Sequence, residues 1–261
     1  MTAHPHDHHW PRLLAVAEAG GAPALIAAIR EEEDPGLRRA LFLLSLRRIA
    51  SSEFPNASLD TSLEVARAAI AEGVRQAESE ADPEEAARRK DFANVLSYNL
   101  SADLAECWPE DPRPRRREHF EAGLQAAEDC LRWREELDKG PMPFSLAHWA
   151  HGIHALSLGR IETAIRSFEA SLSAAREAAR RDERSPTEGA ESTFGVHLGL
   201  GYLGIARMRS GDPEGEDLLD RALACFDLQR QAHPEESSEV DFGIAQLRTA
   251  EERTRGAAER T

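Results

Sequence analysis

Apolar residues recur along this chain at intervals of three and four positions, the spacing that places them on one face of an α-helix. No convincing run alternates apolar and polar residues in the manner of a half-buried strand. The pattern predicts helices near residues 11–19, 23–33, 36–50, 59–80, 83–108, 112–137, 144–158, 160–182, 187–210, 213–231 and 237–254. Short connections make consecutive helices antiparallel neighbours. We therefore expect an all-α fold of tandem antiparallel helical hairpins.

Several predicted helices begin where an acidic residue precedes a proline. Four such residues occur: Asp34, Asp82, Asp111 and Asp212. An aspartate accepts a hydrogen bond from a free backbone N–H at a helix start, and proline fits the first turn because its missing N–H has no partner there. Two further starts have the spacing of a capping box, Thr61 with Glu64 and Ser185 with Glu188.

The hairpins repeat in a common register. A small residue stands midway along three predicted first helices, at Ser101, Gly152 and Gly204. The second helices each carry a bulky residue followed by a small residue and leucine, beginning at Phe120, Phe168 and Leu219, with a weaker copy at Ala66. The bulky residue fills the seam, and the small one lets the partner helix approach. A fixed register predicts stacked supersecondary units, in which a large side chain at a central glycine is destabilising.

These repeats resemble the tetratricopeptide repeat. Its pattern is matched by Gly152, Gly159, Ala164, Phe168 and Leu172, with further matches at 98–101 and at Gly204 with Gly211. The resemblance covers about residues 92–225. It departs from the family in that the copies lie about fifty residues apart, where about thirty-four is usual, and His148 occupies an expected bulky position. The resemblance implies an α-α superhelix with an N-terminal helical cap.

Four segments are expected along the chain. They are a flexible histidine-rich N-terminus (1–10), an N-terminal helical cap (11–81), the tetratricopeptide-like hairpins (82–232), and a C-terminal capping helix with a flexible tail (233–261).

The resemblance also implies a binding surface, because in that family the first helices line a concave groove. The corresponding positions here are Val95, Tyr98, Ala102, Leu146, Trp149, Ile153, Leu156, Leu198, Gly201, Ile205 and Met208. They are nearly all apolar, which favours an amphipathic helix or an apolar peptide as the ligand. In the alternative interpretation, the N-terminal helices or a closed bundle fill the groove. The stretch 194–208 favours this alternative, because a helix that is apolar nearly all round is normally buried on every side.

Charge and cysteine content limit the classes of partner and the cellular compartment that we expect. The net charge of −15 disfavours nucleic acid and anionic membranes as partners and favours basic or neutral ones. The three cysteines, Cys107, Cys130 and Cys225, imply no disulfide framework. We find neither a signal peptide nor an apolar run long enough to span a membrane, so we expect a cytoplasmic protein.

Two motifs invite a chemical interpretation. The stretch 199–204 has the glycine spacing of a dinucleotide-binding loop, but no strand precedes it, so close helix packing is the better interpretation. His148, His151 and His154 step along one helix beside Trp149 and could hold a zinc ion or anchor a polar ligand. No second set of ligands is evident, so packing between helices is favoured.

Two clusters of basic residues lie outside these motifs. The N-terminal histidines are His4, His6, His8 and His9, and 2–4 could form a copper or nickel site if Met1 is removed, although we expect no function for it. The second cluster is Arg113, Arg115, Arg116 and Arg117. It is interpreted as a solvated face with i,i+4 pairs such as that to Glu121. Recruitment of an acidic or phosphorylated partner is the alternative.

No catalytic motif is evident, and no pair of carboxylates is singled out for acid–base work. The leading hypothesis is a non-catalytic scaffold or adaptor that binds an unidentified protein or peptide, with no cofactor and no metal. Two alternatives stay open. One is a small-molecule-binding or enzymatic helical domain with an interior pocket near Trp149 and His151. The other is a homodimer that buries its apolar face against a second copy.

Overall fold

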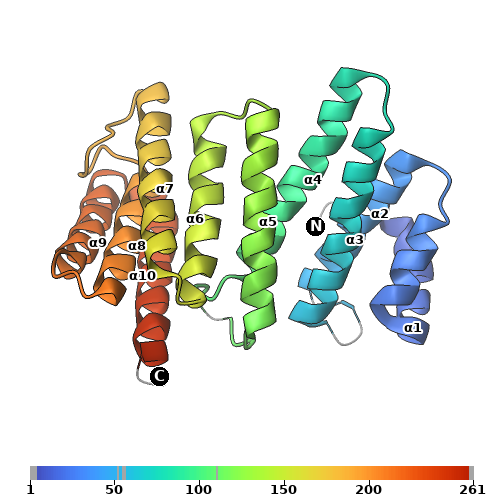
Figure 1. Cartoon of the computed structure of the whole chain (residues 1–261), viewed down its shortest axis with the longest axis horizontal. Helices are drawn as coiled ribbons and strands as arrows, with labels where there is room; N and C mark the ends of the chain where they lie inside the picture. The colour runs from blue at the N-terminus through green and yellow to red at the C-terminus, as the bar shows by residue number, and fades with distance from the viewer. Residues whose placement is uncertain (1–4, 52, 55–56, 110, 259–261) are drawn as a thin grey trace. The chain divides into compact units, whose positions relative to one another are not determined.

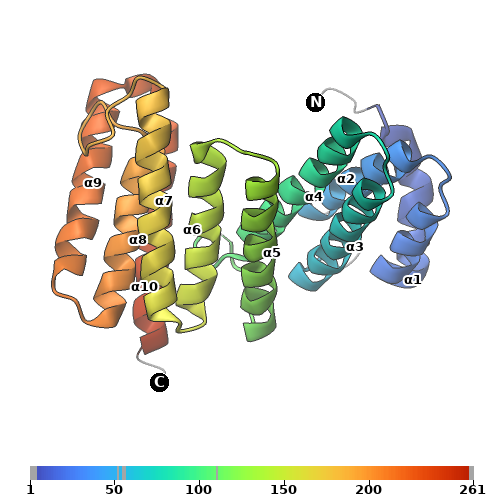
Figure 2. The same cartoon turned by 45° about the horizontal axis from the view of Figure 1, so that its top comes forward.

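A computed structural model describes residues 5–51, 53–54, 57–109 and 111–258 of the chain, with side chains described up to residue 255. Within these ranges all regular elements are helical, which confirms the all-α prediction. They are η1 (Asp7–His9), α1 (Trp10–Arg30), α2 (Pro35–Ala50), α3 (Leu59–Glu78), α4 (Pro83–Leu104), α5 (Arg117–Glu136), α6 (Pro141–Ser157), α7 (Ile161–Arg181), α8 (Phe194–Ser210), α9 (Glu214–Ala232), η2 (Pro234–Glu236) and α10 (Ser237–Ala258). Consecutive helices such as α6 and α7 pack side by side (Figures 1 and 2).

Three of the four predicted aspartate caps are present. Asp34 accepts the N–H of Gly36 at 2.8 Å, and Asp82 and Asp212 accept the N–H groups of Glu84 and Glu214 at 3.0 Å. These bonds satisfy backbone donors that have no partner inside their helices.

The fourth aspartate cap is wrong, because Asp111 lies in a turn before α5. Its carboxylate accepts the N–H of Arg113 at 3.0 Å and also binds the guanidinium groups of Arg113 and Arg115. Pro114 disfavours helical backbone at the residue before it. The helix therefore begins only at Arg117. Its N-cap residue is Arg116, whose backbone N–H is accepted by His119 Nδ1 at 3.2 Å.

Both predicted capping boxes are also wrong. The cap of α3 is Ser58, whose hydroxyl accepts the Thr61 N–H at 3.1 Å. Ser185 lies in a loop, where its hydroxyl accepts the Thr187 N–H at 3.3 Å and its carbonyl accepts the Ser192 hydroxyl at 2.9 Å. This loop occupies 182–193, so α8 begins at Phe194 and not near residue 187.

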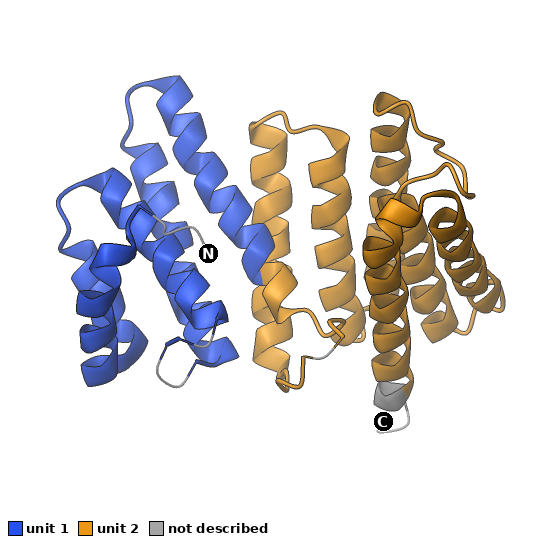
Figure 3. Ribbon diagram, turned by 180° about the vertical axis from the view of Figure 1, so that it is seen from behind, with its two compact units in different colours: residues 1–100 blue, residues 101–261 orange. Residues whose placement is uncertain are grey.

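The chain forms two compact units, Met1–Leu100 and Ser101–Thr261 (Figure 3). The boundary falls inside α4, whereas the sequence analysis placed its boundary between residues 81 and 82, in the turn before that helix. Most of α4 belongs to the first unit because it packs closely on α3. A Cβ atom on Gly73 would lie 2.8 Å from the Phe92 ring and 3.3 Å from the Arg89 carbonyl oxygen.

The first unit has a hydrophobic core to which the N-terminus contributes. Residues 1–10 were expected to be flexible, yet Asp7–His9 form a 3₁₀ turn and Trp10 is buried in the core. Asp7 pairs with Arg48 at 3.1 Å, and the Arg48 guanidinium lies 5.8 Å from the centre of the Trp10 ring. These contacts explain why structure begins before the predicted start of the first helix.

A buried carboxylate, Glu72, connects α2 and α3 in the same unit. Arg38 and Arg75 contact it at 2.7 and 2.6 Å, and the Gln76 side-chain amide donates to it at 2.5 Å. Burial opposes its ionisation, but the three hydrogen bonds outweigh that effect and lower the pKa of Glu72 to about 2. The negative charge of Glu72 is thus neutralised by arginines of the same unit, as a buried carboxylate requires.

The first helix has an unexpected membrane-like composition. By length and composition, the helical stretch Asp7–Arg30 could cross a membrane, with a mean hydropathy of 1.5, although the sequence analysis identified no such stretch. The backbone is non-helical at Gly20 and Gly21, which confirms the predicted break between 11–19 and 23–33. Leu13, Leu25 and Ile29 are fully buried in the core, as in a core helix of a globular unit.

The second unit is built around α8, which contacts α7, α9 and α10. A Cβ atom on Gly199 would lie 3.2 Å from Leu172 of α7, one on Gly201 would lie 2.4 Å from Leu247 of α10, and one on Gly204 would lie 2.7 Å from the Leu219 nitrogen of α9. The three glycines therefore serve close packing on three sides, as the sequence analysis favoured for this motif.

The predicted register of small and bulky residues is found in the hairpins. In α6, Gly152 faces the Phe168 ring of α7, where an added Cβ would lie 2.6 Å from a ring carbon. The Ser101 hydroxyl donates to the Gly123 carbonyl of α5 at 2.9 Å. Each small residue thus lies where two helices approach most closely.

We expect Gly204→Ala to lower the stability of the second unit by about 1–3 kcal/mol, because the new methyl group would meet backbone atoms that cannot move aside. Thermal unfolding followed by circular dichroism measures the effect. Gly195→Ala is the control in the same helix, since its Cβ would make an ordinary 3.6 Å contact with Ala175. Equal melting temperatures for the two variants would contradict the packing described.

Candidate functional site

The C-terminal helix α10 packs on α8 and α9 of the second unit. Its Gln246 side chain donates to the Tyr202 hydroxyl of α8 at 3.0 Å, and its Leu247 packs on Gly201. The Phe242 ring stacks on Trp108, with 6.0 Å between ring centres. Within the second unit the chain itself therefore packs on α8 with α10, whereas the alternative interpretation named the N-terminal helices or a closed bundle for this role.

The expected groove residues consequently lie in different environments. Trp149, Ile153, Leu156 and Ile205 are buried, with exposures of 5%, 3%, 6% and 1%. Leu198 and Met208 are half-buried, and Leu146 is 37% exposed. Trp149, Ile153 and Leu156 each border one of two cavities, whereas Ile205 lines neither of them.

The other groove residues lie near the boundary of the units. Val95, 47% exposed, and the half-buried Tyr98 belong to the first unit. Ala102 is half-buried at the start of the second unit, where its carbonyl accepts the Trp108 indole N–H at 2.7 Å.

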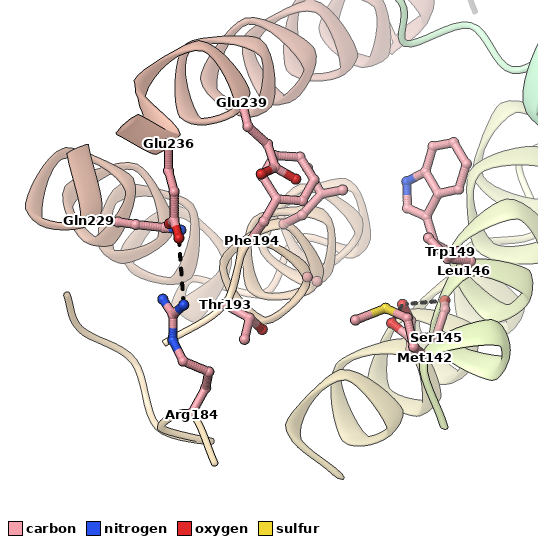
Figure 4. A pocket seen from close by; sticks show the side chains of 14 residues that line it. Met142, Ser145, Leu146, Trp149, Arg184, Thr193, Phe194, Gln229, Glu236 and Glu239 are labelled. Atoms are coloured by element: carbon pink, nitrogen blue, oxygen red, sulfur yellow. Dashed lines mark hydrogen bonds and ion pairs between the residues drawn. The ribbon is translucent and has the colours of Figure 1, made fainter. Parts of the chain in front are cut away.

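A cavity of about 410 Å³ adjoins the start of α8, and three of the expected groove residues line it. These three are Leu146, Trp149 and Leu198, which form an apolar wall together with Met142 and Phe194. Figure 4 shows Trp149 and its α6 neighbours on one side of the cavity, with Arg184 and Glu236 on the other. We name this space the α6–α8 cavity.

The far side of the α6–α8 cavity is polar. Arg184, from the loop after α7, lies 3.5 Å from Glu236, whose other oxygen accepts the Gln229 amide at 2.7 Å. These hydrogen bonds, above all the one from Gln229, lower the pKa of Glu236. The carboxylate is therefore charged at neutral pH. Glu239, in the first turn of α10, also lines the cavity.

A buried histidine supports this polar wall. The oxygen of Gln229 lies 3.0 Å from His197 Nδ1, while His197 Nε2 lies 3.1 Å from the Gly189 carbonyl. Burial lowers the pKa of His197, whereas its hydrogen bonds to Gln229 and Gly189 act in the opposite direction. The network holds the loop 182–193 against α8 and α9.

The cavity can bind a ligand but offers little for chemistry. The hydroxyls of Ser145 and Ser171 lie 3.4 Å apart, and Ser171 donates to the Ser145 carbonyl at 2.8 Å, so neither hydroxyl is placed against a histidine. The Thr193 hydroxyl oxygen is buried and has no hydrogen-bond partner within the described part of the chain. An apolar wall with a few polar groups is the composition of a binding pocket.

The three histidines of α6 do not converge on one point. His154 Nε2 donates to the Ser101 carbonyl at 2.8 Å, and His151 Nδ1 donates to the Ser167 hydroxyl at 2.7 Å. His148 is half-buried beside Phe144. The rings at 151 and 154 therefore join helices, which is the packing role that the sequence analysis favoured.

Another histidine lies in the one group of potential metal ligands found among the described residues. His233, Glu235 and Glu236 bring one potential ligand atom each within 4.8 Å of one another. His233 lies 3.6 Å from both Glu191 and Glu235, and Glu236 is held by Arg184 and Gln229. Of the three residues, Glu236 is therefore already paired with a cation of the chain itself. The N-terminal motif at 2–4 lies outside the described residues.

A polar cluster that the sequence analysis missed lies beneath α10. Gln246 lies 3.6 Å from the Cys107 sulfur and bonds to Tyr202, and the Trp149 indole lies edge-on to the Tyr202 ring. Burial raises the pKa of Cys107 to about 11 and raises that of Tyr202 well above its ordinary value. A thiol with so high a pKa is not a nucleophile at neutral pH, so this cluster is structural.

Sequence reasoning also missed the polar wall of the α6–α8 cavity. Its residues are Arg184, Thr193, Gln229, Glu236 and Glu239. They come from the loop 182–193 and from α9, η2 and α10, and no local spacing connects them. The fold alone brings them together.

No protein-family model matches the chain, and no curated protein or solved structure matches it.

The buried histidine His154 should make the protein sensitive to acid. Burial lowers its pKa to about 4 from an ordinary 6.5, so between these values the unfolded chain binds a proton that the folded chain does not. The stability contributed by neutral His154 is complete above pH 6.5 and falls as the pH drops towards 4.

From pH 8 to pH 5 we expect the wild type to lose about 2 kcal/mol more unfolding free energy than His154→Gln, which keeps a donor for the Ser101 carbonyl but cannot be protonated. Urea unfolding at each pH measures the difference. Parallel stability–pH curves for the two proteins would contradict it.

Proposed function

We propose that this chain is a non-catalytic, tetratricopeptide-like binding module of the cytoplasm, and that its α6–α8 cavity receives an apolar group of a protein partner. The hairpin register at Ser101, Gly152 and Gly204 supports the relation to helical repeats. A superhelical arrangement of the hairpins is part of the proposal. Cys107, Cys130 and Cys225 are buried and form no disulfide among the described residues, which is compatible with a reducing compartment.

The observation that carries the proposal is the α6–α8 cavity, beside which Leu146 is exposed at 37%. Ligand pockets commonly measure about 300–1,000 Å³, and this one, at about 410 Å³, is near the lower end. A cavity of this size suits a short segment of a protein partner that inserts one or two apolar side chains. A whole helix does not fit, because α10 occupies the face on which such a helix would lie.

Charge at the cavity specifies the partner further. Glu239 is exposed and has no ion-pair partner among the residues that the structure describes, while Glu236 carries a second carboxylate. Arg184 is already bonded to Glu236 and to the carbonyl oxygens of Glu191 and Ser192. The cavity thus favours a segment in which a lysine or arginine stands beside a bulky apolar residue, in agreement with the net charge of −15.

A small molecule is the second candidate occupant. The partnerless hydroxyl of Thr193, buried among the cavity residues, favours it because a ligand acceptor or donor would satisfy that group. The required ligand would carry an apolar body with a polar end.

Selection from a library of short displayed peptides tests the protein-partner proposal. We expect enriched peptides to combine an apolar residue with Lys or Arg, and Leu146→Arg to weaken their binding by at least about tenfold in fluorescence anisotropy. The matched control is Leu228→Arg, which adds the same charge at a side chain that is 48% exposed in α9 and does not line the cavity.

Equal loss of binding in the two variants, or enrichment of no peptide, would reject the cavity as a protein-binding site. Displacement of an enriched peptide by a small metabolite would instead favour the second candidate.

A further inference from the structure

A second cavity, of about 400 Å³, has a basic lining although the protein is strongly acidic. It lies where the ends of α6 and α8 meet the start of α5 and the last turns of α10. Arg115, Arg209 and Arg253 line it, against a single acidic residue, Glu106. It shares no lining residue with the α6–α8 cavity, so it is a separate site.

Arg115 is the buried member of this set. Its side chain has no exposed surface, and it bonds to the Asp111 carboxylate at 2.6 Å and to the carbonyl oxygens of Arg113 and Asp103 at 2.7 and 3.0 Å. Its Nε–H is buried and has no acceptor within the ranges that the structure describes. Leaving a donor on a charged group unpaired in the interior costs free energy, so this N–H marks a position where an acceptor is missing.

The other two arginines have no carboxylate partner among the residues that the structure describes. Arg253 donates to the Asp111 carbonyl at 3.0 Å, and Arg209 has no hydrogen bond or ion pair to any described residue. Elsewhere the arginines of this chain are commonly paired with acids, as Arg207 is with Glu214 and Arg221 with Glu188. Two half-buried guanidinium groups that have no counter-ion within the described part of the chain are suited to pair with an external anion.

Part of the lining of this second cavity is apolar. Phe120, Ile153 and Leu156 line it, so the cavity can hold a hydrophobic body as well as an anionic head. Because two guanidinium groups are unneutralised, the charge suits a dianion better than a single carboxylate. Arginine matches the oxygens of phosphate through its fixed array of donors.

We infer that this second cavity binds a phosphate monoester whose phosphate contacts Arg209 and Arg253, and whose apolar part lies on Phe120, Ile153 and Leu156. The ligand chemistry is common to soluble phosphate esters and to lipids with a phosphomonoester headgroup. The site is independent of the proposed protein-binding function, because a different cavity carries each.

Isothermal titration calorimetry with phenyl phosphate and with inorganic phosphate, at constant ionic strength, tests the inference. We expect phenyl phosphate to bind more tightly, because its ring adds apolar contact. Arg209→Gln and Arg253→Gln should each weaken binding by at least about tenfold, the effect of losing a charge-assisted hydrogen bond. Arg248→Gln is the control, since it removes an exposed charge from α10, the helix of Arg253, at a position outside the cavity.

Absence of binding by the folded wild type, or equal weakening by Arg248→Gln and Arg253→Gln, would overturn the inference. A nonspecific origin is disfavoured at the outset, because the net charge of −15 repels anions. Circular dichroism melts show whether each variant is folded.

Sedimentation with vesicles distinguishes the two sources of the phosphate. Binding to phosphatidylcholine vesicles that contain phosphatidic acid, lost in Arg253→Gln, would identify a lipid headgroup. Binding of phenyl phosphate without vesicle binding would identify a soluble ester. Either result supports the site, since both require the same arginines.

Discussion

The enclosure of α8 is the constraint on which the second unit depends. Three glycines along this helix allow α7, α9 and α10 to approach it from different sides, at distances that an added Cβ would not tolerate. Tyr202, on the same helix, is fully buried and bonds to Gln246 of α10. Since interiors are packed as densely as organic crystals, a helix of larger residues could not hold all three neighbours. The glycine motif is therefore a packing device, and the position of α10 follows from it.

The position of α10 in turn determines which surfaces are available for binding. Its central residues cover the face that a tetratricopeptide-like groove would expose, so no helix-sized ligand can lie there while α10 is in place. Binding space is left at its two ends. Glu239 in its first turn lines the apolar α6–α8 cavity, and Arg253 near its end lines the basic one. The start and the end of α8 border the same two cavities through Phe194 and Arg209, so one pair of packed helices places both candidate sites.

The two cavities differ in charge because nearby carboxylates pair with some of their arginines and not with others. Before α5, Asp111 neutralises Arg113 and Arg115, and no carboxylate of the described residues pairs with Arg209 or Arg253. At the other cavity, Arg184 pairs with Glu236, and Glu239 has no cationic partner in the part of the chain that the structure describes. Neither result follows from net charge. In an acidic chain, a cavity with unpaired arginines arises only when folding separates those arginines from the surrounding carboxylates.

Much of the fold could be predicted from the sequence, because helix formation depends on residues within a few positions of one another. Apolar periodicity located the helices, three Asp-Pro pairs located starts, and the glycines of 199–204 indicated a helix buried on every side. The sequence also singled out Leu146, Trp149 and Leu198, which line one cavity. Tertiary structure alone decided that α10 covers the groove, that Arg115 is buried, and that residues from separate segments form each polar wall. These outcomes depend on contacts such as that of Gln246 with Cys107, between residues far apart in the chain, and local spacing carries no information about which distant segments will meet.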